Sequence, residues 1–286
     1  MVYARKGNGA VLAGLLLFGF LALPTHAQEK ISSDAAGKTG DGWHISIAPY
    51  AWLVGISGDV TVHGRTAHTS TPFNDILKNL DFGGLMQIEA WKGNWGFFLQ
   101  PNFLKLTPTS SFSSPTNADI AQGGPAVREA HARLDSQTLM VEFGGFYSVA
   151  RWGTANKQGY GSFDVLAGGR YWYQQAHVFL NLPNRGFNID DTAYVSIIDP
   201  ILGFRILSYL APKLFVRLRG DAGGFGVSSN TSHFSWNAVG LLGYDISPKA
   251  TVAAGYRYLY INYSGTGSSG VKLDFQGPVM GFEYTF

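Results

Sequence analysis

The last seven residues of the sequence, Met280 to Phe286, alternate strictly between two kinds of side chain. Met280, Phe282, Tyr284 and Phe286 are apolar or aromatic, whereas the residues between them are small or polar. Because alternate side chains of a strand point to opposite faces, this segment predicts a strand with one apolar and one polar face. Such a strand needs an apolar environment on one side, and lipid provides it for the strands of a transmembrane barrel.

The start of the sequence predicts export. Arg5 and Lys6 precede an apolar stretch at 11–23, and Ala27 ends a small-x-small cleavage pattern, so residues 1–27 are expected to be a Sec signal peptide. The stretch is too short for a transmembrane helix, which needs about 20 apolar residues. Cleavage would leave 19 basic and 19 acidic residues. Residues 28–42 are expected to be a polar linker, and 43–286 a single barrel domain.

The composition excludes several classes of protein. Charged residues make up 14% of the chain, against roughly 25% in soluble domains, while aromatic residues also reach 14% and glycines number 37. No apolar run of helical membrane length follows residue 27, which argues against a helical membrane protein. The chain contains no cysteine and its charges balance, so neither a disulfide framework nor a nucleic-acid-binding surface is expected.

Alternating segments repeat along the rest of the chain. The clearest lies at 233–246, where the even positions are almost all apolar and the odd positions are largely polar or small. Ten such segments predict an all-β, antiparallel up-and-down transmembrane barrel. They are 43–54, 81–92, 94–106, 134–149, 160–175, 193–209, 213–225, 233–246, 250–263 and 271–286.

The connections between these segments alternate in length. Short connections at 92–94, 151–159, 210–213 and 247–249 are expected to face the periplasm. The longer ones, at 55–80, 107–133, 176–192, 226–232 and 264–270, are expected to face outside.

Two segments complicate this prediction. Residues 55–80 could form a hairpin followed by a short amphipathic helix at 72–80, and a barrel of twelve strands is the alternative. In 271–286 the apolar positions change from odd to even near Gly277 and Pro278. One extra residue there would restore a single lipid face, which predicts a β-bulge.

Projecting the alternation inward predicts a network of charges in the barrel interior. Buried charges persist when they are paired, and arginine can hold a carboxylate with two donors. The predicted set contains six acids and five arginines: Glu89, Glu142, Asp164, Arg170, Asp199, Arg205, Arg217, Arg219, Asp221, Arg257 and Glu283. Because ten strands lie near the narrow end of the range of barrels, a packed polar core is favoured over an open pore.

Three segments, at 218–227, 255–263 and 81–89, resemble a group of proteobacterial outer-membrane β-barrel proteins. The resemblance covers about 43–286. It implies a barrel in the outer membrane, in contact with phospholipid and lipopolysaccharide, and it transfers no catalytic residue. The ending at Phe282, Tyr284 and Phe286 is similar to the aromatic signal that the barrel-assembly machinery reads in such proteins.

The sequence leaves three functions open. The first is a narrow channel or transporter for small solutes, and the second is a closed structural or adhesion-type barrel that acts through its outer loops. The third is a hydrolase at the outer rim, which is disfavoured because the loop histidines lie in no recognisable catalytic motif. No cofactor and no metal site is predicted, and the oligomeric state is left open.

Overall fold

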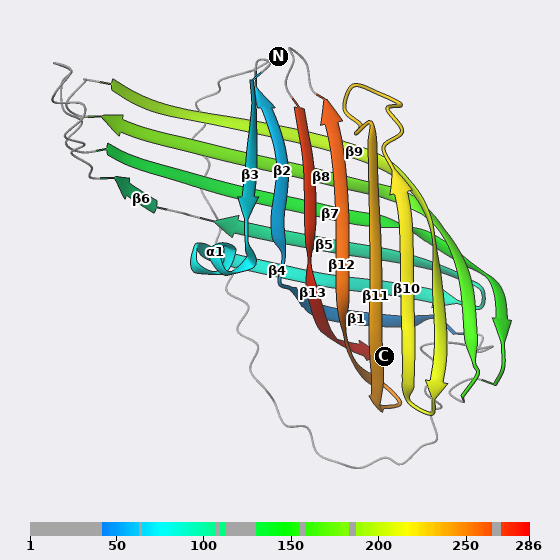
Figure 1. The fold of residues 1–286 in the computed structure, drawn as a ribbon. Coiled ribbons are helices and arrows are strands. Elements are labelled where there is room, and N and C mark those ends of the chain that lie inside the picture. The colour runs from blue at the N-terminus through cyan, green and yellow to red at the C-terminus, as the bar shows by residue number, and fades with distance from the viewer. Residues whose placement is uncertain are drawn as a thin grey trace.

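The computed structural model describes residues 42–62, 65–106, 109–112, 130–154, 158–182, 187–264 and 270–286. Ten strands form a closed antiparallel barrel, because β1 pairs with β4 on one side and with β13 on the other (Figure 1). They are β1 (His44–Trp52), β4 (Leu80–Lys92), β5 (Trp95–Leu106), β7 (Ala130–Trp152), β8 (Gly161–Leu182), β9 (Phe187–Ala211), β10 (Leu214–Gly223), β11 (Phe234–Ser247), β12 (Ala250–Ser264) and β13 (Gly270–Thr285). The prediction of a ten-stranded up-and-down barrel is therefore confirmed. The signal peptide and nearly all of the predicted linker lie outside the described residues.

Three further strands and a helix complete the described chain. They are β2 (Gly55–Val62), β3 (Arg65–Thr71), the helix α1 (Phe73–Lys78) and β6 (Thr109–Phe112). The hairpin of β2 and β3 continues the line of β1 along β13, since Trp52 lies opposite Val279 and Gly55 lies opposite Gln276. The predicted hairpin and helix are confirmed. The twelve-strand alternative is wrong, because β1 closes directly on β13 and the hairpin only extends the sheet beyond that closure.

The predicted bulge in the last strand is also wrong. The pairing of β13 with β12 runs without a shift past Gly277 and Pro278, and the pairing with β1 and β2 keeps one register across the same point. The apolar positions switch from odd to even because the apolar environment lies inside the barrel near 273–275 and outside it from Met280 onward. Leu273 and Phe275 pack inside the barrel, whereas Met280 and the even positions after it face outward.

The two ends of the barrel differ, and we name them by their connections. At the turn end, short connections at 93–94, 212–213 and 248–249 join adjacent strands. Strand β1 begins and strand β13 ends at this end of the barrel. The opposite, loop end carries the hairpin, α1 and the connection between β10 and β11 at 224–233. In bacterial outer-membrane barrels the short turns face the periplasm, so the loop end is expected to face outside.

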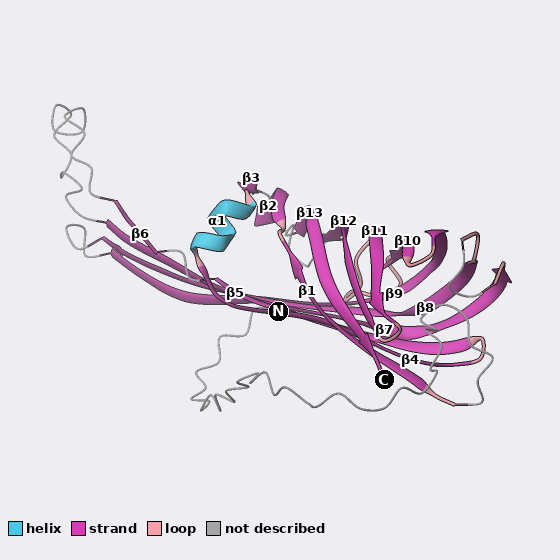
Figure 2. Ribbon diagram, turned by 90° about the horizontal axis from the view of Figure 1, so that it is seen from below, coloured by secondary structure: helices cyan, strands magenta, loops and turns pink. Residues whose placement is uncertain are grey.

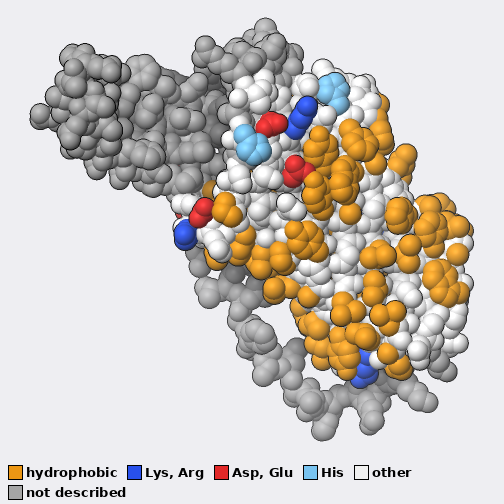
Figure 3. All heavy atoms as spheres, in the orientation of Figure 1, with side chains coloured by type: hydrophobic (Ala, Val, Ile, Leu, Met, Phe, Trp, Pro, Cys, Tyr) orange, Lys and Arg blue, Asp and Glu red, His pale blue; other side chains and the backbone are white. Residues whose placement is uncertain are grey.

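A broad apolar surface covers the outside of the barrel. Outward-facing side chains such as Leu202, Leu218 and Leu242 are 44–61% exposed, and Figure 3 shows hydrophobic side chains spread over the face formed by β10 to β13. Aromatic rings mark the turn end of this belt, where Trp95 is 66% and Tyr244 is 47% exposed. An apolar belt that ends in aromatic rings is the surface that a transmembrane barrel presents to lipid. No helix among the residues that the structure describes is long and apolar enough to cross a membrane.

Strands β7, β8 and β9 are much longer than the others and project beyond the barrel at the loop end. They have 23, 22 and 25 residues, against 10 in β10, and β10 leaves β9 at Ile201. Residues 187–200 of β9 thus have no partner in β10, although Ile197 and Asp199 among them still face the barrel interior. Figure 2 shows this projecting sheet, with β6 on its far edge, on one side of the loop end and the hairpin with α1 on the other.

Candidate functional site: a buried charge network

Ten of the eleven charges predicted to face the interior are joined in ion pairs. The eleventh, Asp199, has no arginine within ion-pair distance among the described residues and binds Ser232 and Ser235 instead. The alternation of each strand is what turns these side chains inward. Two groups result: one is centred on Glu142 towards the loop end, and the other lies towards the turn end.

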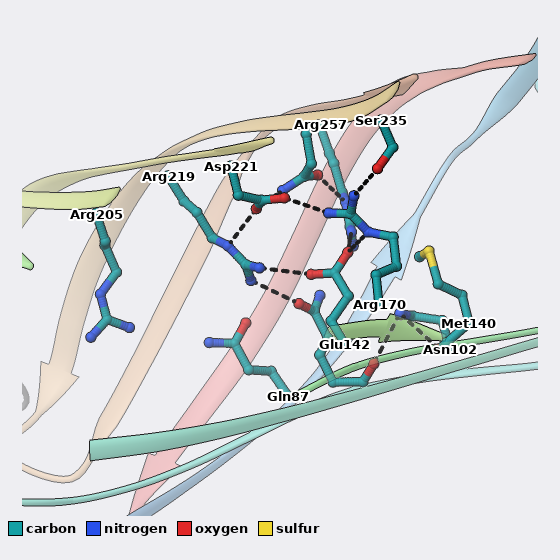
Figure 4. A network of polar contacts seen from close by, with 12 residues as sticks. Gln87, Asn102, Met140, Glu142, Arg170, Arg205, Arg219, Asp221, Ser235 and Arg257 are labelled. Carbon is teal, nitrogen blue, oxygen red and sulfur yellow. Dashed lines mark hydrogen bonds and ion pairs between the residues drawn. The ribbon is translucent and has the colours of Figure 1, made fainter. Parts of the chain in front are cut away.

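The first group, the Glu142 cluster, consists of Glu142, Asp221, Arg170, Arg219 and Arg257. Glu142 is completely buried and accepts hydrogen bonds from three arginines: from Arg170 Nε at 3.1 Å, Arg219 Nη2 at 2.8 Å and Arg257 Nη2 at 2.6 Å. Asp221 binds two of the same arginines, Arg170 at 2.5 Å and Arg219 at 3.0 Å. Figure 4 shows these guanidinium groups converging on the two carboxylates.

The cluster joins strands that lie on different sides of the barrel. Glu142 comes from β7 and is the register partner of Arg170 on the adjacent β8. Arg219 and Asp221 come from β10, and Arg257 comes from β12. Charges removed from water are costly unless partners and hydrogen bonds surround them, and these contacts supply both. The cluster therefore holds opposite walls of the barrel together through its interior.

The second group lies nearer the turn end. Arg205 donates to Glu89 at 2.7 Å and to Asp164 at 2.9 Å, and its guanidinium lies 4.3 Å from the ring centre of Phe146. Arg217 has a single ion pair among the described residues, with Glu283 at 3.2 Å. The side chains of this group are 5–17% exposed, so they are less enclosed than Glu142.

Neutral polar side chains complete both groups. Tyr50 receives hydrogen bonds from Gln100 at 2.6 Å and Arg257 at 3.2 Å, and Asn237 links Arg257 to Asp221. The sequence analysis did not single out these residues, although they occupy inward positions of the same alternation. The same holds for the buried Asp245, which binds the hydroxyls of Tyr209 and Thr251.

Apolar side chains pack on both sides of the charges along one wall of the barrel, in an order that β9 shows well. Its inward residues, from the loop end to the turn end, are Ile197, Asp199, Ile201, Gly203, Arg205, Leu207 and Tyr209. Ile197 belongs to a loop-end layer with Met140, Trp172, Leu259 and Ile261, all at most 6% exposed. Leu207 and Tyr209 pack at the turn end with Tyr160 and Phe215, and these four are at most 6% exposed. On this wall the charges thus lie between the loop-end layer and a smaller apolar cluster at the turn end.

One cavity of about 100 Å³ remains beside the charges. Its polar wall includes Arg205, Arg217, Arg219 and the two carboxylates Glu89 and Glu283. Small residues of β12 and β13, such as Ala253 and Gly281, and several apolar side chains also line it. One water needs roughly 10–15 Å³ of such space, so the cavity has room for several waters.

Two loop-end histidines, His68 and His177, lie beside carboxylates. His68 Nδ1 lies 3.0 Å from Asp59 on the hairpin, and His177 Nε2 lies 2.7 Å from Asp190 on the projecting sheet. Nδ1 of His177 is 3.8 Å from Asp135, so both ring nitrogens face carboxylates and neither is directed at a nucleophile. In the described ranges, no group of three His, Cys, Asp or Glu side chains is arranged to hold a metal ion.

Comparison with known proteins gives likenesses of fold alone. No protein-family model matches the chain, and no curated protein sequence matches it significantly. Similar solved structures include the outer-membrane protease OmpT of Escherichia coli, at 8% identity, TM-score 0.48 and coverage of 89% of this chain and 100% of that one. The attachment invasion locus protein Ail of Yersinia pestis has 9% identity, coverage of 85% and 98% and a TM-score of 0.32. The toluene transporter TbuX of Ralstonia pickettii has 10% identity, coverage of 87% and 90% and a TM-score of 0.33. These proteins differ in activity, so the likenesses assign none to this chain.

Proposed function

We propose that this protein is a closed barrel of the Gram-negative outer membrane that acts as a surface or adhesion-type binding protein through its loop end. The observation that carries the proposal is the complete burial of Glu142 among three arginines, directly beneath the apolar loop-end layer. A water-filled passage at this level would expose the carboxylate and hydrate it.

The size of the barrel supports a closed interior. Barrels of eight strands have an interior that side chains can fill, whereas 16–18 strands leave an aqueous channel. Ten strands lie near the closed end of this range, and Arg170 and Arg257 take up room at the centre while remaining at most 2% exposed. The ion pairs then act as a polar core that fixes the walls.

The loop end offers the surface through which a closed barrel can act. The long strands β7, β8 and β9 project past the barrel, and the hairpin is held on β13 by seven register pairs. Rigid strands can present side chains to a partner with less loss of conformational freedom than mobile loops would incur. The rim hydrolase is the weaker hypothesis, because His177 is engaged by carboxylates on both nitrogens.

A second function, a narrow passage for small solutes, is favoured by one observation. The cavity of about 100 Å³ places Arg205, Arg217 and Arg219 beside space for several waters. A passage would require the Glu142 cluster and the loop-end layer to move aside. The cavity would then be the part of that passage that is already open in this conformation.

Single-channel conductance separates the two functions. The protein without residues 1–27 would be refolded into a planar bilayer, beside the variant Arg217→Ala/Arg219→Ala. Insertion would be checked by the resistance of the barrel to trypsin in vesicles of the same lipid. We expect no conductance from either protein. A steady conductance of the parent protein that the double variant alters would refute the closed barrel and establish the passage.

The surface role has a test of its own. Replacing residues 57–70 with a short Gly-Ser turn would remove most of the hairpin and leave the closure of β1 on β13 intact. Vesicles carrying the parent or the shortened protein would be passed over immobilised collagen, fibronectin and laminin, and over lipopolysaccharide vesicles. We expect the parent to be retained by one of these surfaces and the shortened protein to be retained less. Equal retention of both proteins, or of neither, would contradict a role for the hairpin.

A further inference from the structure

The connection between β10 and β11, residues 224–233, is tied closely to the end of the barrel. Asp199, which is 2% exposed, accepts hydrogen bonds from the backbone N–H of Ser232 at 2.7 Å and from the hydroxyl of Ser235 at 2.8 Å. The N–H of Ile198 donates to the carbonyl of Asn230 at 2.9 Å, which attaches the loop to the outer part of β9. These contacts fix the loop in one conformation.

Within this ordered loop, Phe225 has a backbone conformation that bulky residues rarely adopt. Its φ is 56°, between Gly224 at 86° and Gly226 at 59°. Glycine adopts the left-handed region without penalty, whereas a side chain with a Cβ atom is strained there. Phe225 is 48% exposed, so contacts within the protein cover only about half of its surface. A strained residue that the surrounding structure holds in place is a reason to look for a function of that residue.

A second exposed apolar side chain lies beside it. Val227 is 66% exposed, which is as high as any large apolar residue of the lipid-facing belt. Ser228, Ser229 and Asn230, which follow it, are also exposed and are polar. The loop therefore presents two apolar side chains followed by a polar tip.

The position of the loop relative to the aromatic rings of the barrel bears on the environment of Phe225 and Val227. Strand β10 ends at Gly223, opposite Ser235, so the loop leaves the barrel where Phe234 and Trp236 face outward. The indole of Trp236 stacks on the ring of Tyr258 at 4.6 Å, and such rings mark the boundary between hydrocarbon and headgroups.

The apolar belt continues to the loop along β9. Leu202 is 61% and Ile198 is 49% exposed on the outer face of that strand, and the loop is hydrogen-bonded to β9 at Ile198 itself. The loop is therefore attached to β9 next to an outward-facing residue of the belt.

We propose that the β10–β11 loop is a membrane anchor, in which Phe225 and Val227 insert among the lipids of the leaflet at the loop end. The polar residues 228–230 then meet the headgroups. Because the loop is already ordered by Asp199 and by β9, insertion requires little further loss of conformational freedom. The anchor fixes the depth of the barrel on this side.

The absence of cysteine from the chain makes a direct test practical. Single-cysteine variants Phe225→Cys, Val227→Cys and Ser229→Cys would be labelled with the fluorophore NBD and refolded into phosphatidylcholine vesicles. Leu202→Cys, in the apolar belt, is the control for lipid contact. Ser70→Cys, which is exposed on the hairpin, is the control for water. Each would be measured with and without phospholipid that carries a doxyl quencher near the top of its acyl chain.

We expect the labels at positions 225 and 227 to emit at shorter wavelength and to be quenched by doxyl lipid, as the label at 202 is. The label at 229 should behave like that at position 70. Emission typical of water at 225 and 227, without quenching by lipid, would overturn the proposal. A shift to shorter wavelength without lipid quenching would overturn it too, and would indicate that the loop packs against protein, either its own barrel or a second copy. The result does not depend on whether the barrel conducts ions.

Discussion

Replacing Glu142 with glutamine tests whether the interior of the barrel is held together by buried charge. The substitution keeps the size of the side chain and removes its charge. Arg170 would retain Asp221 as a partner, but Arg257 would keep only uncharged groups, among them Asn237, Tyr50 and the ring of Trp52. The guanidinium of Arg257, which is 2% exposed, would then be buried without a carboxylate.

The expected loss of stability follows from this unpaired charge. Removing one partner of a buried ion pair costs about 3–5 kcal/mol, because the remaining charge has neither its partner nor water. Glu283→Gln is the matched control. It makes the same chemical change in an ion pair that borders the cavity, where waters can hydrate Arg217, so a loss of about 1 kcal/mol is expected.

Reversible urea unfolding in lipid vesicles, followed by tryptophan emission, would measure both variants. The free energy of unfolding should fall several times further for Glu142→Gln than for Glu283→Gln. Adding Arg257→Met to Glu142→Gln should restore part of the loss, since it removes the unpaired charge. If Glu142→Gln and Glu283→Gln lowered stability equally, water would have to reach Glu142, and the closed interior would be refuted.

Two further predictions concern the close approach of two strands and the lipid-facing belt. A Cβ atom at Gly168 would lie 2.0 Å from the backbone oxygen of Phe143, so Gly168→Ala should lower the free energy of unfolding by about 1–3 kcal/mol. At Gly240 the nearest atom is 3.5 Å away, so Gly240→Ala should cost less than about 0.5 kcal/mol when both variants are unfolded in vesicles. Leu202→Arg should cost about 2–4 kcal/mol in the same measurement if this position lies deep in the bilayer. Ser70→Arg on the hairpin should change stability little. Equal effects of the two substitutions would place Leu202 outside the membrane.

The sequence predicts the barrel well because its two faces have different surroundings. In the segment 233–246, lipid requires apolar side chains at even positions and the interior accepts polar ones at odd positions, so the alternation marks β11 to within one residue. The same alternation assigns all eleven predicted charges to inward-facing positions, where the structure has them. It also places Asn237 and Asp245 inward, and these could have been found by the same reasoning.

The signal fails where the surroundings change. Strands β7, β8 and β9 continue past the belt, where lipid no longer selects apolar side chains, and the predicted boundaries are therefore too short there. In β13 the interior becomes apolar at Leu273 and Phe275, and the pattern is easily mistaken for a bulge. Alternation shows which residues face an apolar environment and which face a polar one. It no longer tells inward from outward positions where the interior is apolar and the outer surface is polar.

Which charges meet inside the barrel could not be predicted, for a geometric reason. Alternation gives the face of a residue, whereas a contact across the interior also depends on the stagger and tilt of strands that are far apart in sequence. Glu142 and Arg170 are neighbours on adjacent strands, but Arg257 reaches Glu142 from β12, across the barrel. Arg217, with one partner beside the cavity, and Arg219, with two carboxylates, were indistinguishable in the sequence although they differ in surroundings. The order of layers therefore matters more than the number of charges. An apolar layer at the loop end, packed over balanced ion pairs, makes a polar interior compatible with the closed barrel that we propose.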